Sequence, residues 1–337
     1  MSQAIQVYRG SYLESTHHIH VAVVHASGKL LYAYGDPYRR TFPRSSMKPF
    51  QAVPLIETGA AQAYSYSASD ISLSCASHSG EVIHRSAVLD ILSRAHLEEE
   101  DLQCGTHEPR DKESYKQLIR EGKELTPVFS NCSGKHSGML VTALYMGEDI
   151  KTYREVTHPV QQRILKVISD VCDIPAEEIE LSVDGCGVPV HRLPLYNTAL
   201  GFARLAQPEE QVSAGRAAAL STIREAMTAH PEMVAGTKRL DTDLMRAFGG
   251  RVVAKVGAEG VQCMGITDLG IGIAIKTEDG TARAAGVAAM EVLRQLGVAD
   301  EAAYEKLKDY AHAPVYNARN EVIGVIEPNF ILEPVDE

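Results

Sequence analysis

The sequence predicts an α+β fold in which both ends of the chain contribute strands to one sheet. Apolar residues alternate, as in strands, near the start at residues 19–34 and again at residues 252–276. The long stretch between these regions has apolar residues at helical spacing. Separate runs of strands and helices are typical of α+β proteins. Because the 337 residues contain no internal repeat or obvious linker, we expect a single domain over residues 1–337.

The first two strands are expected to form a hairpin. Apolar residues alternate over residues 19–24, which predicts a strand with one buried face. Residues 25–28 include a glycine and form the turn, and residues 29–34 return as the antiparallel partner. A polar loop, residues 36–43, then leads to Ser45.

The middle of the chain is expected to be helical because its apolar residues recur three and four positions apart. The clearest helix spans residues 81–95. The first ends at Gly59, and Pro54 is expected to kink it, since proline has no backbone N–H to donate. In chain order, the expected helices are residues 46–58, 69–76, 81–95, 137–146, 159–172, 193–205 and 213–230.

The last third of the chain is expected to supply the remaining strands. These are residues 252–256, 261–266 and 271–276, which are joined by turns that contain glycine. Two helices, residues 282–296 and 301–310, follow them.

The composition is that of a soluble globular protein. Hydrophobic residues make up 45% and charged residues 23% of the chain, and the formal net charge is −11. A nucleic acid or an anionic membrane would need a basic face, which this charge disfavours. No apolar run approaches the roughly 20 residues of a membrane span. The N-terminal residues lack a basic region followed by an apolar core. We therefore expect a cytoplasmic protein.

The cysteines favour free thiols or a metal or catalytic site over disulfides. All six are scattered and none forms a Cys-x-x-Cys pair. In a large chain expected in the cytosol, such spacing does not predict a disulfide framework. The six are Cys75, Cys104, Cys132, Cys172, Cys186 and Cys263.

Ser45 and Lys48 form the most informative motif. Residues three apart on a helix share a face, so the lysine could reach the serine hydroxyl. A neutral lysine could then take the proton of a nucleophilic serine. Chance alone gives about one Ser-x-x-Lys match in a chain of this length. The alternative is a serine helix cap followed by an exposed lysine.

Four further stretches combine small and polar residues, namely residues 74–80, 130–138, 182–189 and 251–260. Each has a purely structural explanation, such as a glycine-capped helix end, a loop before a helix or a buried inert cysteine. In the last stretch, Lys255 lies within a β-branched strand. A lysine there is costly unless it is paired or neutral, or unless its head reaches water.

Together, these stretches resemble the bacterial L-asparaginases typified by the rhizobial enzymes, over nearly the whole chain. Five motifs in the same order are more specific than any one of them. They are Arg44–Pro49, Cys75–His78, Asn131–His136, Asp184–Gly187 and Ala254–Gly260. The resemblance implies an α/β/α sandwich like that of serine β-lactamases and glutaminases, in which Ser-x-x-Lys opens a helix. It also implies hydrolysis of L-asparagine to L-aspartate and ammonia by a homodimeric enzyme.

The resemblance implies two Ser–Lys tandems, Ser45 with Lys48 and Ser77 with Lys255. We expect Ser45 to attack the side-chain carboxamide and a neutral lysine to accept its proton. An acyl-enzyme would form and then be hydrolysed. Ser77 is expected to bridge the two lysines. The sequence does not decide which of the two serines is acylated.

A zinc ion close to the substrate is also implied, held by Cys132, Lys135 and Cys186. General rules of zinc coordination would favour His136 over a lysine. For the zwitterionic substrate, we expect Arg44 to bind the carboxylate and Asp184 the ammonium, with His136 as a further polar contact.

Three alternatives remain open. A glutaminase or a penicillin-recognising hydrolase could share the fold, and Cys132 with His136 could act as a cysteine nucleophile and its base. The third alternative is a non-catalytic amino-acid sensor that keeps the pocket.

Overall fold

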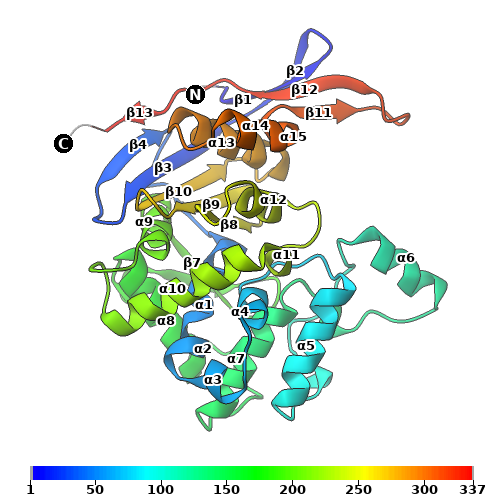
Figure 1. Ribbon diagram of the computed structural model, residues 1–337, viewed down its shortest axis with the longest axis vertical. Coiled ribbons are helices and arrows are strands. Elements are labelled where there is room, and N and C mark those ends of the chain that lie inside the picture. The colour runs from blue at the N-terminus through cyan, green and yellow to red at the C-terminus, as the bar shows by residue number, and fades with distance from the viewer. Residues whose placement is uncertain (1–2, 336–337) are drawn as a thin grey trace. The chain divides into compact units, whose positions relative to one another are not determined.

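The computed structural model describes residues 3–335 and divides into two compact units. The first, here called the sheet unit, comprises residues up to Ser46, Leu193–Ala206 and the residues from Asp243 onwards. The second, here called the helical unit, comprises Met47–Arg192 and Gln207–Thr242. Figure 1 shows their elements. The expected single domain over residues 1–337 stays a prediction.

The sheet unit is built around a six-stranded antiparallel sheet. Its strands are β13 (Glu333–Pro334), β4 (Leu30–Tyr34), β3 (Ile19–His25), β10 (Ile271–Thr277), β9 (Val261–Ile266) and β8 (Val252–Gly257), in that spatial order. Early and late strands meet where β3 pairs with β10, in a register that places Val23 opposite Ile273. The prediction that both ends of the chain form one sheet is confirmed.

Helices cover both faces of this sheet, as the α/β/α prediction requires. Helix α9 (Leu195–Ala206) packs on one face, and Figure 1 shows α13 (Ala282–Gln295) on the other. A Cβ atom on Gly272 of β10 would lie 1.9 Å from the Ala199 carbonyl oxygen. Only glycine therefore allows α9 to approach the sheet so closely. Two short helices, α14 (Glu301–Lys306) and α15 (Lys308–Ala311), follow α13.

A second sheet in this unit was not predicted. It has the order β11 (Ala313–Tyr316), β12 (Val322–Pro328), β1 (Ile5–Arg9) and β2 (Tyr12–His17). Strand β2 is largely exposed, so its sequence lacks the alternation that marks a half-buried strand. Strand β1 is held by β12 from the other end of the chain, and β2 is held by β1, so pairing rather than local pattern determines these strands.

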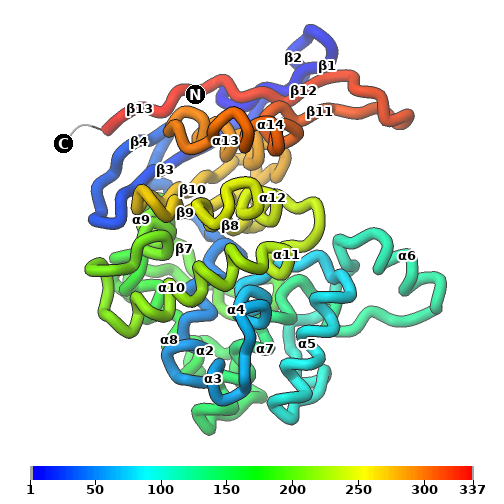
Figure 2. Tube along the Cα trace, viewed as in Figure 1, coloured from blue at the N-terminus to red at the C-terminus, as the bar shows by residue number. Residues whose placement is uncertain are grey.

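The helical unit packs short helices around α7. Residues 133–143 of α7 are all buried. The chain trace in Figure 2 follows the unit from α1 to α11. Its helices are α1 (Lys48–Gln51), α2 (Val53–Glu57), α3 (Ala60–Ala63), α4 (Ala68–Ser74), α5 (Val82–Arg94), α6 (Lys112–Arg120), α7 (Ser133–Tyr145), α8 (Pro159–Cys172), α10 (Ala214–Ala229) and α11 (Pro231–Val234).

Shorter elements connect these parts. Strand β7 (Pro189–Pro194) pairs with β6 (Glu180–Val183), and its last two residues pair with β5 (Arg40–Thr41). Helix α12 (Leu240–Ala247) follows α11. The 3-10 turns are η1 (Arg44–Met47), η2 (Glu99–Asp101), η3 (Pro127–Phe129) and η4 (Ala176–Glu178). Within residues 3–335, none of the helices combines the length and the apolarity that crossing a bilayer requires.

Three predicted helices differ in the structure. The helix expected at residues 301–310 is divided at Leu307 into α14 and α15. The stretch expected as one helix at residues 46–58 is divided into η1, α1 and α2, and both α-helices have a proline in their first turn. A proline cannot donate to the preceding turn, so each one starts a new helix. Helix α7 begins at Ser133, four residues before the predicted start. Its polar first turn is buried, and tertiary packing there overrides the sequence pattern.

Buried His191 predicts a loss of stability in acid. It lies on β7, is 2% exposed, and its Nδ1 has no hydrogen-bond partner. Burial, followed by the nearby charge of Lys135, lowers the pKa of His191 to about 4. In the unfolded chain this histidine has a pKa near 6.5, so below that pH it binds a proton while the folded histidine is still neutral. The free energy of unfolding should therefore decrease as the pH falls from 6.5 to 4, by at most about 1.4 kcal/mol per pH unit for this group.

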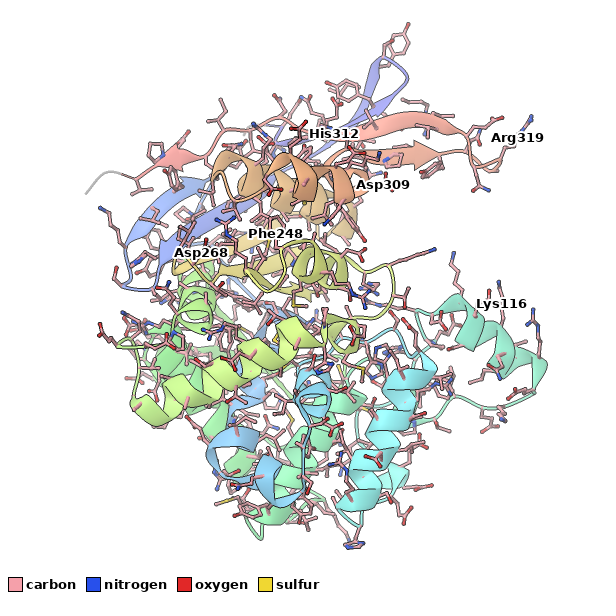
Figure 3. All side chains as sticks on the ribbon, viewed as in Figure 1. Lys116, Phe248, Asp268, Asp309, His312 and Arg319 are labelled. Carbon is pink, nitrogen blue, oxygen red and sulfur yellow. The ribbon has the colours of Figure 1, made fainter. Side chains whose placement is uncertain are left out.

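The expected result is that His191→Phe flattens this slope. Denaturant unfolding at pH 7.5 and pH 5.0 measures it. The control is His312→Phe, because the His312 side chain projects from the surface (Figure 3). Equal pH dependence in both variants and the wild type would rule out this role for His191.

Candidate active site

Lys48 and Ser77 meet inside the helical unit. Lys48 opens α1 and is 1% exposed. Its Nζ lies 3.0 Å from Ser77 Oγ and donates to the carbonyl oxygens of Ala76, at 2.5 Å, and Asn131, at 3.4 Å. A neutral amine has two N–H donors and one lone pair. A charged Lys48 donates to Ser77 Oγ across this contact, and a neutral Lys48 can accept the Ser77 hydroxyl proton along it.

The surroundings of Lys48 favour its neutral form. Burial lowers the pKa of Lys48, and the charge of Lys135 lowers it further, against an opposing effect of Cys132 and Cys186. Desolvation penalises the charged form of a lysine most where no water reaches it. A lysine in this state can accept a proton from a serine.

The loop after α4 places Ser77. Ser77 N–H donates to the Val234 carbonyl oxygen at 2.8 Å, and Ser79 Oγ donates to that of Ala235 at 2.8 Å. These bonds connect the loop to the end of α11 and the residue that follows it. On the other side of the loop, the Ala76 carbonyl oxygen accepts a hydrogen bond from Lys48 Nζ. Ser77 is therefore held by several bonds rather than by one.

His78, the next residue, adds a hydrogen-bonded chain whose role the sequence did not reveal. Gly80 N–H donates to His78 Nδ1 at 3.1 Å, so Nε2 carries the proton and donates to Ser133 Oγ at 2.9 Å. Ser133 in turn donates to the Val128 carbonyl oxygen. Burial, and then the charge of His84, holds the pKa of His78 well below its usual range. This neutral ring links the serine loop to the start of α7.

Ser45 and Lys255 belong to the sheet unit. Ser45 lies in η1, directly after Arg44, whose φ of 56° is unusual for an L residue. A Cβ atom on Gly257 would lie 2.1 Å from the Pro43 carbonyl oxygen, so β8 ends against the backbone that leads into Ser45. Lys255, also on β8, is fully buried, and its Nζ donates to the Val256 carbonyl oxygen at 2.8 Å.

The two tandems join residues of different units. Ser45 and Lys255 belong to the sheet unit, whereas Lys48 and Ser77 belong to the helical unit. The structure brings Lys48 to Ser77. The pairing of Ser45 with Lys48 and of Ser77 with Lys255 stays a prediction.

The three residues expected to hold zinc lie together in the helical unit. Lys135, in the first turn of α7, donates from Nζ to Cys186 Sγ at 3.0 Å. Cys132 immediately precedes α7, and the two sulfurs are close enough to share a hydrogen bond. Cys186 sits in the turn between β6 and β7, where Gly187, with a φ of 85°, donates to the Asp184 carbonyl oxygen.

The cluster holds one group that favours a negative charge, Cys132, and one that favours a positive charge, Lys135. The hydrogen bond from Cys186 holds the pKa of the Cys132 thiol well below its usual range, despite burial. The same bond, together with burial, raises the pKa of Cys186. Burial opposes the charge of Lys135, but the two sulfurs outweigh it and raise the pKa of this lysine. We place a thiolate on Cys132 and an ammonium on Lys135.

A thiolate on Cys132 also assigns the orientation of a neighbouring amide. The Asn131 side-chain oxygen is placed 2.9 Å from Cys132 Sγ, as acceptor of a thiol proton. A thiolate has no proton to donate. We infer that the Asn131 amide is turned so that its NH₂ group faces the sulfur, since the two amide orientations differ little in shape.

His136 supplies an unsatisfied nitrogen beside this cluster. Its Nδ1 lies 2.6 Å from Tyr153 Oη, and its buried Nε2 has no hydrogen-bond partner. Burial lowers the pKa of His136 to about 4, against an opposing effect of Cys186. Among residues 3–335, no three His, Cys, Asp or Glu side chains converge as metal ligands. A zinc ion here would therefore need Lys135, which is not among the usual zinc ligands, and the zinc expected at Cys132, Lys135 and Cys186 stays a prediction.

The predicted substrate contacts are divided between the units. Asp184 lies in the turn beside Cys186 and His136 lies on α7, both in the helical unit, whereas Arg44 belongs to the sheet unit. Asp184 is half-exposed and accepts from Gly185 N–H. Its carboxylate is therefore accessible to an ammonium group. The binding of substrate by Arg44, His136 and Asp184 stays a prediction.

One known protein family matches nearly the whole chain. A family described as L-asparaginase II matches residues 5–328. No curated protein sequence matches the chain.

Solved structures resemble the chain at low identity. The protein Mglu in its native form is 12% identical, with a TM-score of 0.46, and the match covers 84% of this chain and 66% of that one. This chain thus spans just under two thirds of that protein. A β-lactamase from Mycobacterium bovis is 13% identical, with a TM-score of 0.37 over 78% of this chain and 88% of that one. A D-alanine carboxypeptidase from Burkholderia cenocepacia is 14% identical, with the same score and coverage. At these identities the likeness says nothing of what this chain hydrolyses.

The His78 chain predicts an effect on turnover. Ser133→Ala removes the acceptor of the His78 Nε2 proton without removing the ring. The serine loop should then shift, because this bond no longer ties it to the start of α7. Displacements near 1 Å can cost about 100-fold in rate, and we expect amidase kcat to fall 10- to 100-fold while KM changes less. His78→Ala should give at least the same loss.

The control for this prediction is Ser93→Ala on the exposed face of α5, which should leave kcat unchanged. An unaltered kcat in a folded Ser133→Ala variant would show that His78 only fills space.

Proposed function

Because the chain belongs to the L-asparaginase II family, we propose that it hydrolyses the side-chain amide of L-asparagine to L-aspartate and ammonia. Family membership supports an amidohydrolase, and the substrate is part of the proposal. One observation carries the chemistry: the buried Lys48 amine, whose pKa is lowered by burial, lies 3.0 Å from Ser77 Oγ. A serine activated by a lysine needs no catalytic histidine.

The proposed reaction has two halves. Ser45 attacks the carboxamide carbon, its proton passes to a neutral lysine, and the departing nitrogen takes a proton and leaves as ammonia. Water then attacks the acyl-enzyme, with the lysine again accepting a proton, and releases L-aspartate. Ser77, which contacts Lys48, would relay the proton of Ser45. The same contact makes Ser77 the competing nucleophile.

The mechanism depends on Lys48 being held neutral and fixed. Two carbonyl oxygens, of Ala76 and Asn131, accept its N–H groups and direct the lone pair towards the serine hydroxyl. These carbonyls also stabilise the charged form after proton transfer, since an ammonium adds one more donor. Lys255 would serve the second serine in the same way, as the sequence predicts.

Substrate contacts belong to the same proposal. Arg44 is the predicted partner of the α-carboxylate and Asp184 that of the α-ammonium. His136, with its unpaired Nε2, is the further polar contact.

We propose that Cys132, Lys135 and Cys186 hold zinc, with His136 as the neighbouring nitrogen. Zinc would supply a fixed positive charge that orders this part of the site and orients the substrate. Lys135 and Cys186 must lose protons to act as ligands. Because the sulfurs raise the pKa of Lys135, zinc affinity should rise with pH.

Ammonia release tests the proposed function directly. Wild type should release ammonia from L-asparagine, and Ser45→Ala, Ser77→Ala and Lys48→Met should each lose at least 1000-fold, because each removes a member of the proton-transfer chain. Ser93→Ala is the matched control. L-glutamine and nitrocefin, tested in parallel, distinguish a glutaminase or a penicillin-recognising enzyme. Ammonia released faster from glutamine than from asparagine would change the assigned substrate.

Mass spectrometry with a slow acylating substrate identifies the nucleophile. An adduct on Ser45 supports the assignment, and an adduct on Ser77 alone would reverse it.

Metal removal tests the zinc proposal. Purified protein should contain one zinc ion per chain, and Lys135→Gln should lose it, whereas Lys166→Gln, at an exposed site on α8, should retain it. Chelation should raise KM because the substrate is no longer oriented. If chelated protein keeps both its KM and its kcat, the proposed role of zinc is wrong.

A cysteine nucleophile is the second candidate, favoured by the low pKa of Cys132. The imidazole does not support it, because His136 Nδ1 faces Tyr153 Oη and the sulfur that acts on the His136 ring is that of Cys186, not Cys132. Loss of activity in Cys132→Ser with zinc content intact would support the cysteine instead.

Assembly as a homodimer and a cytoplasmic location complete the proposal. Light scattering of the purified protein tests the first, and fractionation of the source cells tests the second.

A further inference from the structure

Two arginines beside the Ser77 loop have no carboxylate partner. In a chain with a net charge of −11 and 44 acidic residues, a surface arginine readily finds an anion. Yet within residues 3–335, neither Arg110 nor Arg239 makes an ion pair or a hydrogen bond. Arg110 is exposed and Arg239 half-exposed, so both guanidinium groups remain accessible to a ligand.

Arg110 is carried by a loop that is attached to both sides of the Lys48 site. The loop spans residues 105–111. Asp111 N–H donates to the Ser79 carbonyl oxygen at 2.9 Å, and Asn131 N–H donates to His107 Nε2 at 2.8 Å. A Cβ atom on Gly80 would lie 2.7 Å from Pro109 Cβ, so the loop also packs tightly on the serine loop.

Arg239 is carried by a second segment attached to the same serine loop. Val234 and Ala235, at the start of this segment, accept the hydrogen bonds from Ser77 and Ser79 described above. Thr237 N–H donates to Glu81 Oε1 at 2.7 Å. Between Thr237 and Arg239, Lys238 adopts a φ of 56°, a conformation that costs energy in an L residue.

The two guanidinium groups are close enough to repel one another. Partial burial lowers the pKa of Arg110, and the positive charge of Arg239 lowers it further. Cys132 and Asp241 act in the opposite direction. Asp241, which is buried, offsets part of this repulsion. Two like charges within electrostatic range of one another are destabilising until an anion compensates them.

We propose that Arg110 and Arg239 together bind the α-carboxylate of the amino-acid substrate and so select amino-acid amides over simple amides. A carboxylate has two oxygens, and planar guanidinium groups donate to it in pairs. This inference rests on the proposed function and transfers to this pair the carboxylate that the sequence assigned to Arg44.

The test compares L-asparagine with β-alaninamide, which is asparagine without its α-carboxylate. Arg110→Gln and Arg239→Gln should each raise KM for L-asparagine by about 10- to 100-fold, because each removes charge-assisted hydrogen bonds. At the same β-alaninamide concentration, the rate of each variant should differ from that of wild type by less than threefold. Arg110→Lys should recover only part of the loss, since lysine cannot donate in pairs. Arg120→Gln, in the exposed last turn of α6, is the matched control.

Binding separates this inference from the proposed reaction. Calorimetry on the holoenzyme, with L-aspartate and with β-alanine, which lacks the α-carboxylate, needs no turnover. The Gln variants should lose L-aspartate affinity and keep that for β-alanine. If both ligands weaken equally, or if L-aspartate binds all variants and wild type alike, the pair is structural and the inference is wrong. No asparagine hydrolysis by wild type, together with selective loss of L-aspartate binding, would overturn the proposed function and leave the inference standing.

Discussion

The buried amine of Lys48 is the constraint on which the helical half of the site depends. Its nitrogen joins three separate segments, namely the start of α1, the loop at Ala76 and Ser77, and the loop at Asn131. Burial lowers the pKa of the amine, and the carbonyls that accept its protons fix its orientation towards the serine. An unpaired polar group costs free energy in the core, so most buried polar groups are hydrogen-bonded. The bonds that make Lys48 acceptable in the core are therefore the same bonds that aim it at a serine.

Lys48 and Lys135 show that burial alone does not decide the state of a lysine. Both are almost completely buried, yet the pKa of Lys48 is lowered and that of Lys135 is raised. Lys48 contacts two backbone carbonyls and the Ser77 hydroxyl, and burial outweighs the opposing effect of Cys132 on its pKa. Lys135 donates to Cys186 Sγ and lies near the Cys132 thiolate, whose charge compensates the desolvation of the ammonium. One fold thus keeps a base and a cation within the same cluster of side chains.

The charge around the serine loop also differs from that of the whole protein. The chain is strongly acidic, whereas the segments attached to this loop carry Arg110 and Arg239 without acidic partners. In the role inferred for these two arginines, their local positive field attracts a substrate carboxylate. The hydrogen bonds that hold these segments to Ser77 and Ser79 place that field next to the nucleophilic group.

Much of the fold and the identity of most site residues could be predicted from local pattern. The strands at both ends and the long helices α5, α8, α10 and α13 follow apolar periodicity, which reports burial directly. The exposed strands β2 and β6 carry no such pattern and were missed, and the short polar helix α6 was missed although Tyr115, Leu118 and Ile119 have helical spacing. The early start of α7 was missed because its first turn buries polar residues, which only their partners in the fold can satisfy.

The sequence by itself determined the class of fold, the free thiols and the set of chemically capable residues, since these follow from residue type and spacing. Only the tertiary structure decided which residues meet. It brought Lys48 to Ser77, 29 positions away, joined Lys135 to Cys186, linked His78 to Ser133 and left Arg110 and Arg239 without partners. Such contacts join positions far apart in the chain, and the charge of each group depends on neighbours that no local pattern specifies.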